Sequence, residues 1–141
     1  VDKIKLPSLT YRLLGNMLGS ADIIAQMADR CYLEKCRDRL YPEFVVGGLA
    51  TRRTPDGSEQ VVFASGLDLV MKTPDFFVGA KKRLNVDLGA SHQYAHGHFG
   101  GQKLYLDNIE KNVRFAEKIR RDGDRERVAS LSRLPPQLIH A

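Results

Sequence analysis

Three polar side chains at helical spacing near the start of the chain are the residues best suited to chemistry. Asp22, Gln26 and Asp29 lie at positions i, i+4 and i+7, which places them on one face of a helix. Most residues between them are apolar, and an acid buried among apolar side chains is costly unless something pairs with it. A metal ion is one such partner, and an arginine or a set of backbone amides is another.

Asp22 is the candidate metal ligand of this group. A hard divalent ion prefers carboxylate oxygen, and a helix fixes the direction of the ligand. Gln26 and Asp29 would then fix the orientation of that carboxylate without binding the metal themselves. The alternative is that Asp22 is a structural carboxylate and that Asp29 caps a helix beginning near Cys31.

A second group, His92, His96 and His98, forms a weaker alternative metal site. The first two are four residues apart and can share one metal ion if the stretch is helical. Gly97 and Gly100–Gly101 argue against a long helix here, and no glutamate follows the first histidine as in zinc proteases. The simpler interpretation is that these side chains pack a loop against helices.

The other chemical candidates favour ordinary roles. Cys31 and Cys36 have no second pair to complete a zinc site, so we expect reduced thiols in a cytosol-like compartment. Arg52–Arg53 and Lys81–Arg83 are small basic clusters that are better explained as solvated surface than as phosphate contacts. The sequence has no glycine-rich phosphate loop, serine nucleophile elbow or dinucleotide fingerprint.

The composition is that of one globular domain. The 141 residues are 43% hydrophobic and 28% charged, with a net charge of +5. Acids are interspersed with the bases over most of the length, so nucleic-acid binding is not favoured. No apolar run approaches the ~18 residues that cross a bilayer, and the given sequence does not open with a charged-then-apolar leader pattern. We therefore expect a cytoplasmic protein with no membrane partner.

Helical periodicity predicts an all-α fold, an irregular bundle of about five helices. A first helix is expected from Ser8 or Thr10 to about Met27, or from Ser20 if Gly19 breaks it. A second helix is expected over about residues 31–46 and should end at Gly47–Gly48. A third is expected over 75–88, with Thr73-Pro74 as its start signal, and a fourth over 102–121. Residues 61–72 favour helix, residues 51–60 a turn or loop, and residues 89–101 irregular structure. Residues 1–120 would form the helical domain. Residues 121–141, charged and containing Leu134-Pro135-Pro136, would form a tail that is mobile or docked as an extended strip.

One stretch resembles a known family. The residues that carry the likeness are Ala21–Arg30, Tyr32–Lys35 and Leu40–Phe44, followed by the shorter segments Lys72–Phe76, Arg83–Leu84, His98–Gly101 and Leu104–Asn112. Over about residues 13–120 the chain resembles the C-terminal half of HD-domain metal-dependent phosphohydrolases. It is most similar to bacterial members with an Ala-Asp-Leu-x-x-Gln-Met-Ala-Asp-type segment.

The resemblance implies an all-α fold, a divalent metal ion and hydrolysis of a small phosphate ester, for which a nucleotide is one candidate. In the family the metal is held by a His…His-Asp…Asp pattern, and Asp22 fits the final position. Gln26, Asp29 and Arg30 would then lie around the substrate or the metal.

The sequence also departs from the family pattern. It has no adjacent His-Asp pair, and none of its 4 histidines precedes Asp22. Residue 1 is Val rather than Met, and we expect the chain to be the C-terminal portion of a longer enzyme, inactive by itself. The alternative is a non-catalytic helical interaction module that lacks the metal site and self-associates through exposed core surface.

Overall fold

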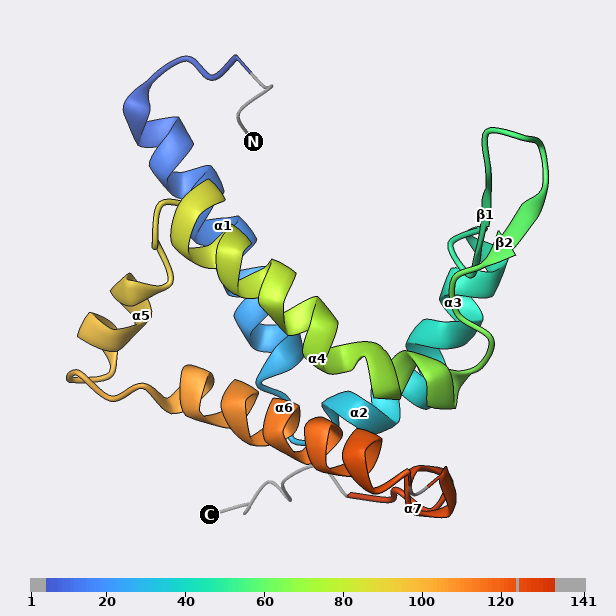
Figure 1. Cartoon of the computed structure of the whole chain (residues 1–141). Helices are drawn as coiled ribbons and strands as arrows, with labels where there is room; N and C mark the ends of the chain where they lie inside the picture. The colour runs from blue at the N-terminus through green and yellow to red at the C-terminus, as the bar shows by residue number, and fades with distance from the viewer. Residues whose placement is uncertain (1–4, 124, 134–141) are drawn as a thin grey trace. The chain divides into compact units, whose positions relative to one another are not determined.

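The computed structural model describes residues 5–123 and 125–133 (Figure 1). These residues are mostly helical, which confirms the predicted all-α class. The elements follow in the order α1 (Leu9–Met27), α2 (Tyr32–Lys35), the π-helical segment η1 (Cys36–Leu40), α3 (Tyr41–Val46), β1 (Thr51–Arg53), β2 (Glu59–Val61), α4 (Gly66–Lys82), the π-helical segment η2 (Arg83–Asp87), α5 (Gln93–His98), α6 (Leu104–Asp122) and α7 (Arg125–Ala129).

The chain divides into two compact units. Unit 1 comprises Val1–Asp29 and Asp75–Asn112, and unit 2 comprises Arg30–Pro74 and Val113–Ala141. Within the described residues, no helix combines the length and apolar character that a bilayer-spanning helix requires.

In unit 1, α1 starts at the predicted cap and continues through Gly19. The Ser8 hydroxyl accepts a hydrogen bond from the Tyr11 backbone N–H at 3.4 Å, which satisfies one of the unpaired amides of the first turn. A Cβ atom at Gly19 would lie 3.1 Å from Leu88 Cδ2. Gly19 therefore does not break the helix, and its lack of a side chain lets Leu88 approach the helix closely.

The C-terminal end of α1 is held by Asn112, a buried residue of α6. Its Nδ2 donates to the carbonyls of Met27 at 2.9 Å and Asp29 at 2.8 Å. Both carbonyls lie at or beyond the last turn, where a helix leaves its acceptors without intrahelical partners. The side chain thereby ties the end of α1 to α6.

Unit 2 begins with the predicted helical run, which ends as expected at Gly47 and Gly48, the latter with φ +69°. The run is not uniform, because the Tyr41 N–H bonds the Cys36 carbonyl five residues earlier. Pro42 follows immediately and lacks an N–H for the usual helical bond. A wide π turn thus precedes the proline instead of a break.

The predicted helix start at Thr73-Pro74 is wrong. Helix α4 runs through Pro74, which lies inside it. The start is set earlier, where the Ser65 hydroxyl accepts from the Asp68 N–H at 3.1 Å and Asp68 Oδ2 accepts from the Ala64 N–H at 3.0 Å. These two bonds form a variant of the capping box, in which the Asp68 carboxylate accepts from the N–H of Ala64, the residue before Ser65, and they satisfy two amides at the helix start. The Thr73 hydroxyl instead bonds the Leu69 carbonyl within the helix.

The prediction of a turn or loop over residues 51–60 was incomplete. Strands β1 and β2 pair antiparallel, with Thr51 opposite Val61. The connection is a turn in which Asp56 accepts from the Thr54 hydroxyl and from the Ser58 N–H, while Gly57 takes φ +86°. Hydrogen bonds from Thr54 and then Ser58 lower the pKa of Asp56 to about 2.

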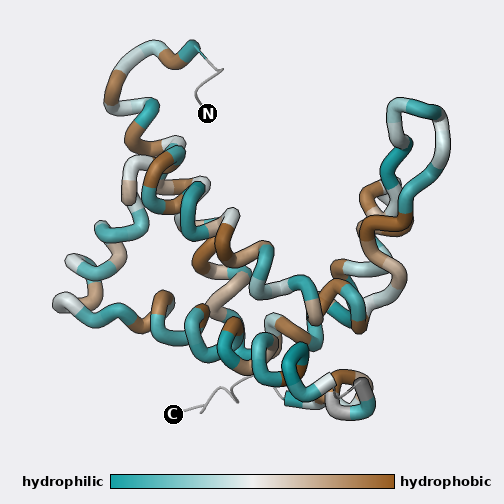
Figure 2. The backbone as a smooth tube through the Cα atoms, viewed as in Figure 1, coloured by the Kyte–Doolittle hydropathy of each residue, from teal (hydrophilic) through white to brown (hydrophobic). Residues whose placement is uncertain are grey.

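Helix α6 confirms the clearest helical prediction. Its residues Ile109, Val113 and Ala116 are buried at the predicted spacing, together with Ile119. Figure 2 shows this pattern as brown positions at intervals along a mostly teal helix.

The core of unit 2 includes part of the expected tail. Its buried members are Leu33, Cys36, Phe63, Leu69, Val70, Ala116, Ile119, Val128 and Leu131. The Arg37 guanidinium donates to the carbonyls of Val128 at 2.7 Å and Ala129 at 2.9 Å, which caps the short α7. Residues 125–133 are therefore docked, whereas Leu134-Pro135-Pro136 lies outside the described residues.

Arg133 fixes the last described part of the chain. Its side chain makes a two-pronged ion pair with Glu34, in which Nε lies 2.9 Å from Oε1 and Nη2 lies 2.9 Å from Oε2. The Arg133 backbone N–H also donates to Glu34 at 2.7 Å. Burial raises the pKa of Glu34, but the side-chain and backbone hydrogen bonds from Arg133 outweigh it, and the net pKa is lowered.

Candidate functional site

Asp22 is exposed on α1, not buried as its apolar neighbours suggested. Gln26, one turn later and also exposed, donates from Nε2 to Asp22 Oδ1 at 2.8 Å. This i, i+4 bond confirms that the two residues share a helical face. It holds the carboxylate in one orientation, with Oδ2 available for a further partner.

The other two residues of the predicted group lie beyond the end of α1. Asp29 is half-buried, and its backbone carbonyl is one of the two bonded by Asn112. It lies two residues before Cys31, the N-cap of α2, and the Cys31 side chain itself makes no capping bond. Arg30 is exposed and belongs to unit 2.

The histidine-rich segment forms the short helix α5, with His92 at its N-cap. The ring centroids of His92 and His96 are 6.1 Å apart, and the rings are nearly perpendicular. The His98 ring packs against Phe99 at 4.8 Å. The segment expected to be irregular therefore contains one and a half helical turns, stabilised partly by aromatic contacts.

The described residues contain no group of three or more histidine, cysteine, aspartate or glutamate side chains that could hold a metal ion. A protein-held zinc or calcium ion needs at least three protein ligands. Asp22 alone does not meet that requirement, and the three histidines do not form such a group either. Asp22 can therefore serve as one ligand of a metal site, and we derive no catalytic step through a metal from this chain.

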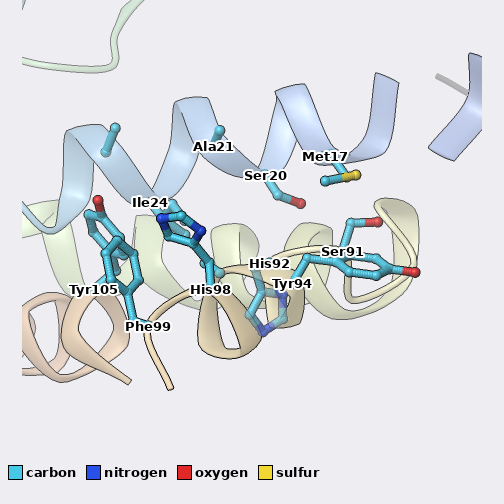
Figure 3. A pocket seen from close by; sticks show the side chains of 12 residues that line it. Met17, Ser20, Ala21, Ile24, Ser91, His92, Tyr94, His98, Phe99 and Tyr105 are labelled. Atoms are coloured by element: carbon cyan, nitrogen blue, oxygen red, sulfur yellow. The ribbon is translucent and has the colours of Figure 1, made fainter. Parts of the chain in front are cut away.

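Unit 1 also contains a pocket of about 470 Å³, which Figure 3 shows from close by. Its lining residues come from α1, from the segment around α5 and from the start of α6: Met17, Ser20, Ala21, Ile24, Ala25, Ser91, His92, Tyr94, Ala95, His98, Phe99 and Tyr105. Most are apolar or aromatic, and none is an aspartate, glutamate, lysine or arginine. Such a lining is typical of small-molecule sites.

Two of the residues that line this pocket each have a buried polar atom without a partner. Within the part of the chain that the structure describes, Ser20 Oγ and His92 Nδ1 are buried without a hydrogen bond, as is Asn16 Oδ1 on the same helix as Ser20. Burial, followed by the nearby His96, lowers the pKa of His92, whereas a hydrogen bond to the Leu84 backbone raises it. The net direction is downward, so the neutral imidazole is favoured.

Sequence reasoning identified the histidines of this pocket but not Ser20, Phe99 or Tyr105. The sequence feature that could have indicated Phe99 and Tyr105 is that these two aromatic residues flank the glycine pair after His98. The contact of that segment with α1 joins residues about 70 positions apart, and no local pattern specifies it.

A comparison with protein-family models, curated proteins and solved structures finds no match for this chain.

Proposed function

We propose that this chain is the C-terminal portion of an HD-type metal-dependent phosphohydrolase. In this proposal Asp22 supplies one ligand of a divalent metal ion whose other ligands lie outside this sequence. The observation that supports it is an exposed carboxylate, oriented by Gln26, beside an uncovered apolar face of α1.

The apolar face has a helical repeat that leads directly to Asp22. Leu14 is 56% exposed and Leu18 is 74% exposed, and Leu14, Leu18 and Asp22 follow one another at four-residue steps. Tyr11, seven residues before Leu18, adds a further exposed side chain to this face. A stripe of large apolar side chains on one helix is typical of a surface that another element covers.

A polypeptide that covers this face would bring its own side chains next to Asp22. The proposed occupant is the segment that carries the His and His-Asp ligands of the family pattern. When bound, such a metal ion would polarise the phosphoryl oxygen and lower the pKa of a bound water molecule. The contribution of this chain is to hold the Asp22 carboxylate in place through Gln26.

The test compares Asp22→Asn with Asp87→Asn in the full-length gene product that contains this chain. Asp87 is an exposed carboxylate of unit 1 that is not on α1, so it is a matched control. We expect Asp22→Asn to reduce metal-dependent hydrolysis of phosphate esters by about 100-fold or more, because even the residues that orient a metal ligand are worth about 10–100-fold, and Asp87→Asn to leave it unchanged. Equal activity of the two variants would remove Asp22 from the site.

The same exposed face supports a second candidate, a non-catalytic interaction module that self-associates through α1. In that case the chain would form dimers whose association is weakened by Leu18→Lys, and neither the chain nor the full-length product would bind metal. Sedimentation velocity of the chain and its Leu18→Lys variant, together with metal analysis, separates the two candidates.

A further inference from the structure

We propose that two copies of this chain pair antiparallel through α1, so that Tyr11 and Leu14 of each copy enter the unit 1 pocket of the other. The inference rests on the self-association candidate above, for which it names the partner surface and the register. It concerns the 141-residue chain and does not depend on metal binding at Asp22.

The outward face of α1 has the spacing of a coiled-coil seam. Apolar residues follow one another at alternating steps of three and four, which are the a and d positions of consecutive heptads: Tyr11, Leu14, Leu18, Ala21 and Ala25. All five are exposed, and Leu18 at the centre is 74% exposed. Side chains at these positions pack by inserting into the holes of a facing helix. The seam is therefore suited to a second helix.

The sizes of the seam residues favour an antiparallel copy of α1 itself. The first half of the seam carries Tyr11 and Leu14, and the second half carries only the two alanines. A two-fold axis at Leu18 places Tyr11 opposite Ala25 of the second copy, since each is seven residues from Leu18. It places Leu14 opposite Ala21 in the same way, so that each large side chain meets a small one. A parallel pair would instead place alanine opposite alanine and leave a gap there.

The pocket of unit 1 lies beside the small half of the seam. Ala21 and Ala25 are among its lining residues, and Figure 3 shows Phe99 and Tyr105 at the Ile24 end of the pocket. The centroids of these two rings are 5.7 Å apart. The Tyr11 ring of the second copy would meet them edge to face or offset-stacked, which are the favourable arrangements of aromatic pairs. One pairing thus covers the exposed face of α1 and fills the apolar pocket.

The charges of α1 also favour the antiparallel direction. Arg12 and Asp22 are the two charged residues of the helix, opposite in sign and in opposite halves. Antiparallel pairing brings the positive half of one copy beside the negative half of the other, whereas parallel pairing would bring like charges together. In the antiparallel register Asp22 lies beside Gly15 of the second copy. A Cβ atom built on Gly15 meets no heavy atom of the described residues within 4 Å, so that side of the helix is open to a close approach.

The size of the interface predicts a weak dimer. Each copy contributes the five seam residues together with the pocket rings of Tyr94, Phe99 and Tyr105. This is fewer than the roughly 20–30 residues that each partner contributes to a standard interface. We expect dissociation in the micromolar range, which sedimentation velocity over a concentration series measures.

A lysine at the two-fold axis tests the seam. Leu18→Lys places two like charges side by side and should weaken the dimer by about tenfold or more. Val78→Lys is the control, because Val78 is 70% exposed on α4 of unit 1, outside the seam and the pocket lining, and it should leave the dimer unchanged. Tyr11→Ala should also weaken the dimer. It should abolish the concentration-dependent shifts that we expect for Phe99 and Tyr105 in ¹H–¹⁵N correlation spectra.

Disulfide trapping tests the register. Tyr11→Cys and Ala25→Cys are purified separately and oxidised mildly, alone and mixed. A disulfide requires Cα atoms within about 7 Å, so we expect linked dimers from the mixture and from neither variant alone. The unchanged chain is the control, because Cys31 and Cys36 are buried.

The possible failures are distinguishable from one another. A chain that stays monomeric at every concentration, or a dimer that Leu18→Lys does not weaken, overturns both this proposal and the self-association candidate. Linked dimers from Tyr11→Cys alone, with none between Tyr11→Cys and Ala25→Cys, overturn the antiparallel pairing but leave self-association standing. None of these results involves metal or phosphate-ester hydrolysis, so none of them bears on the metal-dependent function.

Discussion

Units 1 and 2 differ in how many of their large apolar side chains are exposed. In unit 2 the side chains of Leu33, Ile119 and Val128 are fully buried in one core, and Glu34 is paired with Arg133. Unit 1 carries most of the large apolar side chains that are exposed, including six on α1: Leu9, Tyr11, Leu13, Leu14, Met17 and Leu18. Every buried side-chain nitrogen or oxygen atom without a hydrogen bond in the described residues also belongs to unit 1.

This difference indicates where function resides. Unit 2 also exposes Val45, Val46, Leu49 and Val61, but none of its described side-chain nitrogen and oxygen atoms is both buried and without a hydrogen bond, as is typical of a structural scaffold. Unit 1 has an exposed apolar face on α1, a carboxylate oriented by Gln26 and a pocket with a largely apolar lining, and surfaces of these kinds are typical of binding sites. The comparison therefore assigns stability to unit 2 and binding to unit 1.

The largest expected effect is the difference in stability between two leucine substitutions, one in each unit. Leu33→Ala removes a fully buried side chain of unit 2 and should lower the free energy of unfolding by about 2–5 kcal/mol. Leu18→Ala removes an exposed side chain of α1 and should change the free energy of unfolding by less than about 0.5 kcal/mol. Urea unfolding followed by circular dichroism measures both. Similar losses would mean that the exposed face of α1 is covered in solution.

The Glu34–Arg133 pair gives the next largest effect. Glu34→Gln leaves Arg133 without its ion-pair partner and should cost about 2 kcal/mol at pH 7. The pKa of Glu34 is lower in the folded than in the unfolded state, so its contribution is present above the unfolded value of 4.5 and is lost as the pH falls through the folded pKa.

Urea unfolding between pH 3 and 7 should therefore show a loss of stability below about pH 4.5 that is smaller in the Glu34→Gln variant. Glu117→Gln, at an exposed position of unit 2, is the control and should keep the slope of the unchanged chain. If the free energy of unfolding of Glu34→Gln depends on pH as steeply as that of the unchanged chain, the pair does not stabilise unit 2.

A third comparison uses two buried hydroxyls, one from each unit. Ser20 and Thr73 are both 1% exposed, but only the Thr73 hydroxyl has a partner, the Leu69 carbonyl. Thr73→Val should cost about 1 kcal/mol, whereas Ser20→Ala should be neutral or stabilising, because it removes a buried polar atom that nothing satisfies. A clear loss of stability in Ser20→Ala would mean that the hydroxyl has a partner in solution.

The smallest effect is a pH dependence that arises from His92. Its pKa is lower in the folded state, so the unfolded state binds more protons between the two pKa values. Stability is therefore fully present above the unfolded value of 6.5 and declines as the pH falls toward the folded pKa. Thermal unfolding between pH 5 and 8 should show this decline, and His92→Gln should flatten it. His98→Gln, at an exposed position, is the control.

Elements set by local patterns were predictable from the sequence. The Ser8 cap, the glycine stop at Gly47–Gly48 and the buried face of α6 all follow from short-range rules. The start of α4 was misplaced because Thr73-Pro74 matches a helix-start pattern, while the Ser65–Asp68 capping box that sets the true start was overlooked. The hairpin was missed because strands of three residues are too short to show alternation.

The candidate site was predictable only in part. The shared face of Asp22 and Gln26 followed from their spacing, and the 2.8 Å bond between them confirms it. Sequence spacing could not show that Asp22 is exposed, because burial depends on which elements pack against α1. The pocket could not be predicted for the same reason, since α1 and the segment around α5, which both line it, are far apart in the sequence.

The most direct test of the central claim is the metal content of the full-length gene product and of its Asp22→Asn variant, measured by mass spectrometry after dialysis against metal-free buffer. We predict near-stoichiometric divalent metal in the unchanged protein, a large loss in Asp22→Asn, and no loss in Asp87→Asn. Full metal content in Asp22→Asn would contradict the claim that this carboxylate is a ligand.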